Sequence, residues 1–416
     1  MFSRRRLAKV APFLLGAAVF LFILAQDRSP TTSSLVSTFQ GLRRFQRNSD
    51  LVPQTAGTQK SIGNSSKTLV VNATKIKTND RSKKKESDAF DARKLFDARK
   101  LFDGREKFNA SGKPSEAHPL FPGYIIKNPE LCGSGKVDIL LYLHSAAEQR
   151  VRRRAIRQTW GSSHTFTDIS VKLVFILGLP SDRVNQLRVQ TESASYGDIV
   201  QGNFSDTFKN LTYKAITTLA WINEHCAQAR YVVKADDDMF VDMFRVVTDL
   251  IPKTAGNRFA MVCDHKESMA IQRDERSRWY VSEQAVPSRK NWPPFCPGYF
   301  LVFTADLVPV LYEKSFESKT LVPIDDAYAF GMLREGNITV AISDVHNIIC
   351  SNRRPNPPEE LKANGKFEYV SFGVSKAEEH SQFWSARLLK LSPWEQEHST
   401  YFKTVQLPNG EPLIIA

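Results

Sequence analysis

The sequence predicts an α/β domain with a largely parallel central sheet, and three observations lead to this class. Apolar runs typical of buried strands alternate along the chain with segments of helical pattern. This alternation is typical of domains in which helices cover a parallel sheet. The chain also has 416 residues, of which 42% are hydrophobic and 11% aromatic, so it can bury at least one large core.

The expected elements follow a composition shift near Leu120, where the compact domain is predicted to begin. Strands are predicted at 137–143, 171–177 and 198–201, and a further strand includes Tyr231. Helices are predicted between them, at 148–160, 181–195 and 209–226. In sheets of this kind a ligand binds at the carboxyl ends of the strands. The residues that follow the Tyr231 strand are therefore the first candidates for a site.

Three successive carboxylates follow that strand, in the segment Tyr-Val-Val-Lys-Ala-Asp-Asp-Asp. Asp236 and Asp238 can point oxygen atoms toward a hard divalent cation, which can in turn clamp a diphosphate. A bare Asp-x-Asp also occurs in solvated turns and helix caps, which is the alternative interpretation. Lys234, just before the acids, either pairs with a diphosphate or neutralises the carboxylates.

The amino terminus predicts a membrane anchor. Three arginines at 4–6 precede an apolar stretch at 10–25 that has no charged residue. We expect a cytosolic tail at 1–9, a transmembrane signal-anchor at 10–25 and a lumenal remainder, because positive flanks stay cytosolic. A cleaved signal peptide is the alternative. Residues 26–119 are rich in Ser, Thr, Asn, Lys and Arg, which predicts a flexible lumenal stem.

The net charge of +13 fits nucleic acid, an anionic substrate such as a sugar nucleotide, or a membrane surface. The basic residues are spread through the predicted stem behind the anchor, which argues against nucleic acid. The five cysteines lack Cys-x-x-Cys spacing, which argues against zinc and for up to two disulfides with one thiol left over. Asn-x-Ser/Thr sequons agree with a lumenal location and begin at Asn64, Asn72, Asn109, Asn203, Asn210 and Asn337.

Four further blocks accompany the acids. Arg-Ala-Ile-Arg-Gln-Thr-Trp-Gly at 154–161 follows the first strand, and Asp-Thr-Phe-Lys-Asn-Leu-Thr-Tyr-Lys at 206–214 opens the helix before the acids. Trp-Pro-Pro-Phe-Cys-Pro-Gly-Tyr at 292–299 and Ile-Asp-Asp-Ala-Tyr at 324–328 come after them. Together with 234–238, these blocks resemble glycosyltransferase family 31, the β-1,3-galactosyl and N-acetylglucosaminyl transferases, over roughly 120–350.

The resemblance implies a GT-A-like, Rossmann-type central sheet with flanking helices, in a catalytic domain at 120–416 that follows the single transmembrane helix and the stem. It implies a single-pass type II protein of the Golgi membrane, anchored by its amino-terminal helix. The implied activity is an inverting transfer of a hexosyl group, with galactose favoured, from a UDP-sugar to the 3-hydroxyl of an acceptor glycan on protein or lipid. The product would carry a β-1,3 linkage.

Two alternatives to this activity stay open. An Ile-Asp-Asp motif occurs among relatives that transfer N-acetylglucosamine, so the donor is UDP-galactose or UDP-N-acetylglucosamine. A non-catalytic lumenal sugar-binding relative is the other alternative. The chain also departs from the pattern of many relatives, because one more residue precedes Gly331 after the second acidic pair. This departure bears on acceptor geometry.

The resemblance also implies roles for the acids and for one histidine. It implies that Asp236 and Asp238 hold Mn²⁺ or Mg²⁺, that His346 completes the metal coordination, and that Asp237 holds the ribose. An inverting transfer needs a carboxylate that takes the proton of the attacking hydroxyl. Asp326 resembles the catalytic base of the family, whereas the capping of a helix start is the alternative.

The guanidinium of Arg157 carries a fork of N–H groups suited to phosphate, so Arg157 is the candidate for binding the diphosphate of the sugar donor. Arg152 and Arg153 are expected instead to lie on a solvated face of the helix. Trp160 is predicted to pack in the core, and stacking on a nucleotide base is the alternative. Gly298 lies in a turn that brings backbone close to a ligand. Other aromatic candidates, for stacking on an acceptor sugar or for the core, are Trp279 and Tyr280.

Overall fold

The computed structural model describes residues 118–336, 338–353, 359, 361, 366–401, 403–406 and 412–415. The expected tail, the expected anchor at 10–25 and nearly all of the expected stem lie outside these ranges. Within the described ranges, no helix is long and apolar enough to cross a membrane.

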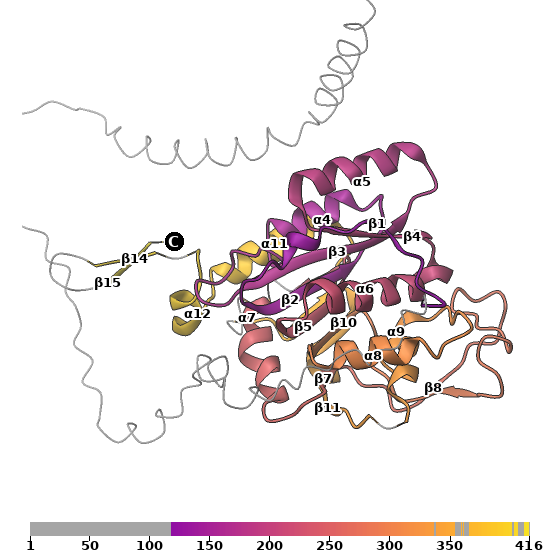
Figure 1. The fold of residues 1–416 in the computed structure, drawn as a ribbon. Helices are drawn as coiled ribbons and strands as arrows, with labels where there is room; N and C mark the ends of the chain where they lie inside the picture. Colours follow the sequence, from indigo (N-terminus) through magenta and orange to yellow (C-terminus); the bar gives the residue numbers. More distant parts are fainter. Residues whose placement is uncertain are drawn as a thin grey trace, which may run out of the picture. The chain divides into compact units, whose positions relative to one another are not determined.

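An eight-stranded mixed sheet forms the centre of the described domain (Figure 1). Its strands, in spatial order, are β1 (Tyr124–Ile126), β4 (Ile199–Ser205), β3 (Val171–Leu179), β2 (Val137–His144), β5 (Ala229–Asp236), β10 (Phe300–Thr304), β7 (Ala260–Cys263) and β11 (Ala341–Asp344).

Strands β4, β3, β2 and β5 run parallel to one another, as predicted. Three pairings depart from the parallel expectation, because β10 runs antiparallel to both β5 and β7, and β1 runs antiparallel to β4. The start of β10 therefore lies at the same edge of the sheet as the end of β5, with Phe300 opposite Ala235.

Helices cover both faces of this sheet (Figure 1). One side carries α4 (Arg150–Arg157), α5 (Arg183–Tyr196) and α11 (Ala377–Leu388). The other side carries α6 (Leu211–His225), α8 (Leu307–Ser315) and α9 (Asp325–Ala329). The helices predicted at 148–160, 181–195 and 209–226 correspond to α4, α5 and α6, so their existence and order are confirmed.

Alternating side chains of β2 serve the two faces, because successive side chains of a strand point to opposite sides. Ile139, Leu141 and Leu143 belong to the apolar cluster beneath α4 and α5. Leu140 and Tyr142 belong to the cluster beneath α6 and α8. A strand that is buried on both faces has a continuous run of apolar residues, and this run allowed the strand to be predicted from the sequence.

A second, three-stranded sheet joins β6 (Met239–Val241), β13 (Ser371–Gly373) and β12 (Ile349–Arg353). Strand β6 begins just after the three acids and pairs with β13. The Val374 amide donates to the Asp238 carbonyl at 2.7 Å, which fixes the backbone of the acidic turn from this side. Smaller elements are β8 (Met269–Ala270), β9 (Asn291–Trp292), α7 (Met243–Arg245), α12 (Pro393–Glu397), β14 (Lys403–Gln406) and β15 (Pro412–Ile415).

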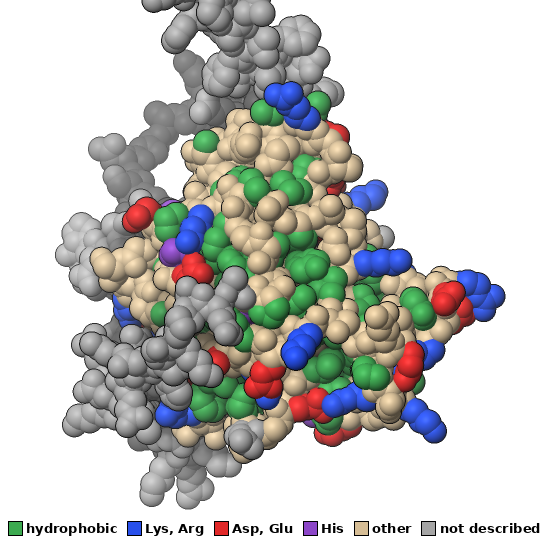
Figure 2. Space-filling view, turned by 45° about the vertical axis from the view of Figure 1, so that its right-hand side comes forward, with side chains coloured by type: hydrophobic (Ala, Val, Ile, Leu, Met, Phe, Trp, Pro, Cys, Tyr) green, Lys and Arg blue, Asp and Glu red, His purple; other side chains and the backbone are tan. Residues whose placement is uncertain are grey.

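Within the described residues, the structure has two disulfides, Cys132–Cys226 and Cys263–Cys296, and a free thiol at Cys350. This confirms the prediction of up to two disulfides with one thiol left over. The second disulfide ties the end of β7 to the segment that precedes β10. On the face shown in Figure 2, basic and acidic side chains lie interspersed, mostly around a central apolar area. The basic residues therefore form no single patch on this face.

Candidate active site

A cavity of about 550 Å³ opens at the carboxyl ends of β2 and β5. Its walls come from these strand ends, the turn at 236–238, the segment before β10, the start of α6 and the start of α9. Sheet register brings the strand ends together, because His144 lies opposite Asp236. The cavity therefore lies where the sequence placed a ligand site.

Asp236 ends β5, Asp237 and Asp238 form the turn to β6, and all three acids line the cavity. The side chains of Asp236 and Asp238 are 39% and 54% exposed, so both carboxylates are open to a ligand. Lys234 lies behind them, almost fully buried, with its Nζ atom 3.1 Å from Asp236 and donating to the Gly298 carbonyl. Burial alone would lower the pKa of Lys234, but the charges of Asp236 and Asp325 raise it, so the lysine stays cationic.

Asp237 is buried and already holds two donors. The Ser145 hydroxyl donates to one carboxylate oxygen at 2.6 Å, and Arg152 donates to the other at 3.0 Å. Arg152 projects from α4 and lies 3.9 Å from Asp238 as well. The expectation that Arg152 sits on a solvated face is therefore wrong, because its guanidinium contacts the acidic turn.

The structure corrects the assignment of Arg157 to the donor phosphate. Its guanidinium makes two hydrogen bonds to Asp198, at 2.7 and 2.8 Å, and one to Glu192 at 2.7 Å. It also stacks between Phe175 and Tyr196 and does not line the cavity. A buried cation with two carboxylate partners and two ring contacts has a structural role in the packing of α4 on α5.

The prediction that Arg153 lies on a solvated helix face is also wrong, because its side chain is fully buried. It shares Glu192 with Arg157, at 2.8 Å, and donates to the Ser145 hydroxyl at 3.0 Å. Through Ser145 this buried network is connected to Asp237 and the cavity. Trp160, predicted to pack in the core, is 1% exposed and donates to His380 at 3.0 Å, which confirms that prediction.

Asp325 and Asp326 form the first turn of α9 and face the cavity. Burial, and then the charge of Asp325, raise the pKa of Asp326 to about 6. Burial acts in the same direction on Asp325, but the hydrogen bond from His144 and the charge of Lys234 outweigh it and lower the pKa of Asp325 to about 2. The pair therefore contains one carboxylate that is ionised throughout the neutral range and one that titrates near pH 6.

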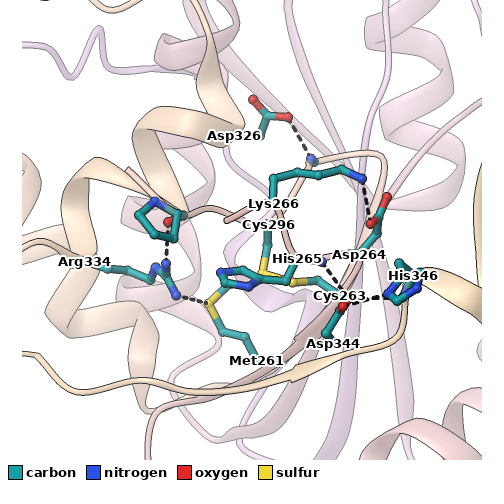
Figure 3. The surroundings of a disulfide bond; sticks show 12 residues. Met261, Cys263, Asp264, His265, Lys266, Cys296, Asp326, Arg334, Asp344 and His346 are labelled. Carbon is teal, nitrogen blue, oxygen red and sulfur yellow. Dashed lines mark hydrogen bonds and ion pairs between the residues drawn. A yellow bond between two sulfur atoms is a disulfide. The ribbon is translucent and has the colours of Figure 1, made fainter. Parts of the chain in front are cut away.

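Asp326 is held by two backbone amides. The Gly298 amide donates to one oxygen at 3.0 Å and the Ala327 amide to the other at 2.7 Å. Figure 3 shows the Asp326 contact beside the Cys263–Cys296 disulfide, which anchors the segment that carries Gly298. A Cβ atom on Gly298 would lie 2.9 Å from Lys234 Nζ and 3.1 Å from Asp326 Cβ, so the close approach predicted there is to protein side chains.

His346 does not line the cavity. Its side chain is 68% exposed, and its Nδ1 atom lies 2.7 Å from Asp344 (Figure 3). This contact leaves Nε2 as the ring atom for a metal, an arrangement common among histidine ligands. The assignment of His346 to the metal stays a prediction.

The donor set of the acidic turn fits a hard divalent cation. Across the ranges that the structure describes, no three His, Cys, Asp or Glu side chains come together as a ready metal cage. Mg²⁺ needs no such cage, because it is commonly held by one or two carboxylates together with substrate phosphates and water. Asp236 and Asp238, both open to the cavity, supply such a pair.

Several residues of the cavity wall were not predicted. His144 ends β2 and Ser145 follows it, and their position at a strand end was the available signal. Lys214 binds Asp206 at 2.7 Å and the Ser145 carbonyl at 2.8 Å. Of the two aromatic acceptor candidates, Trp279 is exposed and lines the cavity, whereas Tyr280 does not line it.

The chain is similar in sequence to known galactosyltransferases. The galactosyltransferase family model matches residues 151–346. Beta-1,3-galactosyltransferase 5 of Pan troglodytes is 31% identical over 226 residues, which cover 54% of this chain and 74% of that protein. Beta-1,3-galactosyltransferase 1 of Homo sapiens is 30% identical over 212 residues, which cover 51% of this chain and 64% of the relative, slightly less than two thirds of its length.

Among solved structures, the galactosyltransferase LgtC, in complex with donor and acceptor sugar analogs, matches 62% of this chain and 99% of its own, with a TM-score of 0.30 and 10% identity.

Proposed function

Because the chain belongs to glycosyltransferase family 31, the β-1,3-galactosyl and N-acetylglucosaminyl transferases, we propose that it moves galactose from UDP-galactose to the 3-hydroxyl of an acceptor sugar, with inversion. The observation that carries this proposal is the convergence of two acidic groups on one cavity. Asp236 and Asp238 line it from the end of β5, and Asp326 lines it from the start of α9. The transfer needs one acidic group to bind the sugar donor through a metal and another to remove the proton of the acceptor hydroxyl.

Asp326 is the proposed base. Its carboxylate takes the proton of the acceptor hydroxyl as that oxygen bonds to the anomeric carbon of galactose, while the bond from this carbon to the diphosphate breaks and UDP leaves with the electron pair. A base with a pKa of about 6 is ionised at neutral pH yet basic enough to accept a proton. The Gly298 and Ala327 amides fix the orientation of the carboxylate.

Asp236 and Asp238 are the proposed ligands of Mn²⁺ or Mg²⁺, with His346 as the proposed third. When bound, the metal supplies positive charge for the diphosphate of UDP. Lys234 keeps Asp236 in place and adds a buried positive charge behind the acidic turn. Asp237, held by Ser145 and Arg152, is the proposed contact for the ribose.

The proposed location is the Golgi membrane, with a type II anchor at 10–25, a stem at 26–119 and a GT-A-like catalytic domain at 120–416 in the lumen. The apolar stretch and its arginine flank support this proposal. The acceptor is proposed to be a glycan on protein or lipid.

The test is UDP release by the purified full-length protein, from UDP-galactose and from UDP-N-acetylglucosamine, with Mn²⁺ or with a chelator and with a panel of sugar acceptors. Metal-dependent release with UDP-galactose supports the proposal, whereas release with UDP-N-acetylglucosamine alone supports the alternative donor. Metal-dependent UDP binding without turnover on any acceptor favours the non-catalytic alternative. No binding of UDP overturns the transferase assignment.

A further inference from the structure

A cationic and aromatic cluster, made of Phe208, Arg278 and Trp279, forms one wall of the cavity. The ring of Phe208 meets the ring of Trp279 edge to face, with centroids 6.3 Å apart. The Arg278 guanidinium lies over both rings, 4.5 Å from the centroid of Phe208 and 4.7 Å from that of Trp279. Arg278 and Trp279 are exposed, so the cluster is open to a ligand.

Arg278 differs from the other basic residues of the cavity wall. Lys214 and Lys234 are buried, and each binds an aspartate, at 2.7 and 3.1 Å. For Arg278, no ion pair with a carboxylate is found in the part of the chain that the structure describes. A guanidinium that lies over aromatic rings makes these contacts without donating its N–H groups to an oxygen atom, so they remain available to an anion.

The cluster and the proposed base line the same cavity, and the segments that carry them are joined by a hydrogen bond. Phe208 precedes α6, and in the first turn of α6 the Thr212 hydroxyl donates to the carbonyl of Val322. Val322 comes three residues before Asp325, where α9 begins. The proposed donor contacts, Ser145 and Asp237, come instead from the ends of β2 and β5.

An acceptor sugar has to lie beside Asp326, because its hydroxyl gives its proton to that carboxylate. Phe208, Arg278 and Trp279 line the cavity into which such a sugar has to enter. Trp279 offers a flat surface for the apolar face of the sugar. Arg278 offers paired donors that match a carboxylate or a sulfate.

We propose that the acceptor carries an anionic group, a carboxylate or a sulfate, and that Arg278 is the residue that selects it. This inference rests on the proposed transferase function and names the class of acceptor. The alternative is that the N–H groups of Arg278 contact the diphosphate of the sugar donor. The experiment below separates the two.

The full-length protein is assayed with UDP-galactose and Mn²⁺ on two matched pairs of acceptors. The first pair is phenyl β-glucoside and phenyl β-glucuronide, and the second is phenyl β-galactoside and its 6-sulfate. In parallel, binding of the same glycosides is measured by calorimetry with UDP and Mn²⁺ present. The variants are Arg278→Gln and, as a matched control, Arg276→Gln, since Arg276 is 90% exposed, is paired with Asp274 and does not line the cavity.

We expect the wild-type protein to prefer the anionic member of at least one pair by about 10- to 100-fold in kcat/KM and in affinity, the usual range for a charge-assisted contact. Arg278→Gln should bring that ratio close to one, whereas Arg276→Gln should keep it. The proposal is overturned if the wild-type protein has the same kcat/KM and the same affinity for the two members of each pair. It is also overturned by an Arg278→Gln variant in which affinity for UDP-galactose falls while the ratio persists, which would assign Arg278 to the diphosphate.

The two proposals fail in different ways. Donor turnover without a preference for anionic acceptors removes the acceptor assignment alone. Absence of donor turnover on every acceptor removes the transferase proposal, and the acceptor assignment with it.

Discussion

The backbone amide of Gly298 donates a hydrogen bond to the Asp326 carboxylate across 3.0 Å, and the carbonyl of the same residue accepts one from Lys234. One peptide segment thus contacts both the proposed base and the lysine behind the acidic turn. The position of Asp326 relative to Asp236 therefore depends on this segment, which the Cys263–Cys296 disulfide holds at the end of β7.

Asp326→Asn should abolish most of the activity. The amide keeps the shape of the side chain but cannot take a proton, so we expect kcat to fall by about 10²- to 10⁴-fold. UDP binding should persist, because the acidic turn is untouched. UDP release and UDP affinity measured on the same preparation check this. Wild-type turnover in the variant would remove Asp326 from the role of base.

The activity should also depend on the ionisation of Asp326. Since its pKa is raised to about 6, kcat/KM should rise with pH through about pH 6 and then level off. A pH profile of UDP release at saturating Mn²⁺ tests this. A profile that is flat between pH 5 and pH 8, about one unit below to two units above that pKa, would contradict the prediction.

The same shift predicts how stability depends on pH. Between about pH 4, the ordinary pKa of an aspartate, and pH 6, folded Asp326 keeps a proton that the unfolded chain has lost. Stability should therefore fall as pH rises through this window, and less so in Asp326→Asn. Asp325 acts in the opposite direction, because its lowered pKa stabilises the fold above about pH 4, and this contribution is lost as pH falls toward 2. Denaturant titrations of both proteins at pH 4.5 and pH 7 measure the difference.

The structure explains which parts of the site could be predicted from the sequence. The acids after Tyr231 were visible because a buried strand ran straight into three charges. Arg157 was misassigned because its partners, Glu192 and Asp198, lie 35 and 41 residues away, and only the packing of α4 on α5 brings them together. His144 was missed because its place opposite Asp236 is a property of sheet register, which no local pattern encodes.

Arg157→Met should therefore affect folding rather than donor binding. Its removal leaves Asp198 with a buried, unpaired charge, whereas Glu192 keeps Arg153, so we expect a loss of about 2–4 kcal/mol in the free energy of unfolding. The KM for UDP-galactose should stay within about twofold of the wild-type value in the folded protein. A large rise in KM at unchanged stability would restore Arg157 to the donor site.

Asp238→Asn should weaken metal-dependent binding of UDP. The side chain is half exposed, so its loss should leave stability within about 0.5 kcal/mol, while the metal loses one of its two proposed carboxylates. We expect at least about a tenfold loss of affinity for UDP in the presence of Mn²⁺ and little change in chelator. Asp249→Asn is the control, since Asp249 is 36% exposed and lies outside the cavity. Equal effects of the two substitutions would contradict the metal role of Asp238.

Gly298→Ala tests whether the segment before β10 sets the geometry of the base. The added Cβ atom would lie 2.9 Å from Lys234 Nζ and 3.1 Å from Asp326 Cβ, so one of these side chains has to move. The lysine is the far end of a flexible chain, but its ammonium is held by Asp236 and by the Gly298 carbonyl. Small displacements of a reacting group cost up to about 10²-fold in rate, and we expect kcat to fall by about 10- to 100-fold.

The pH profile separates this cause from a loss of folding. If the methyl group displaces Asp326 from the Gly298 amide, the carboxylate loses a hydrogen bond that favours its ionised form, and the apparent pKa of kcat/KM should rise above about 6. A variant that is merely destabilised would keep the wild-type pKa in its folded fraction. Full activity with an unchanged pKa would show that the contact between Gly298 and Asp326 does not control the base.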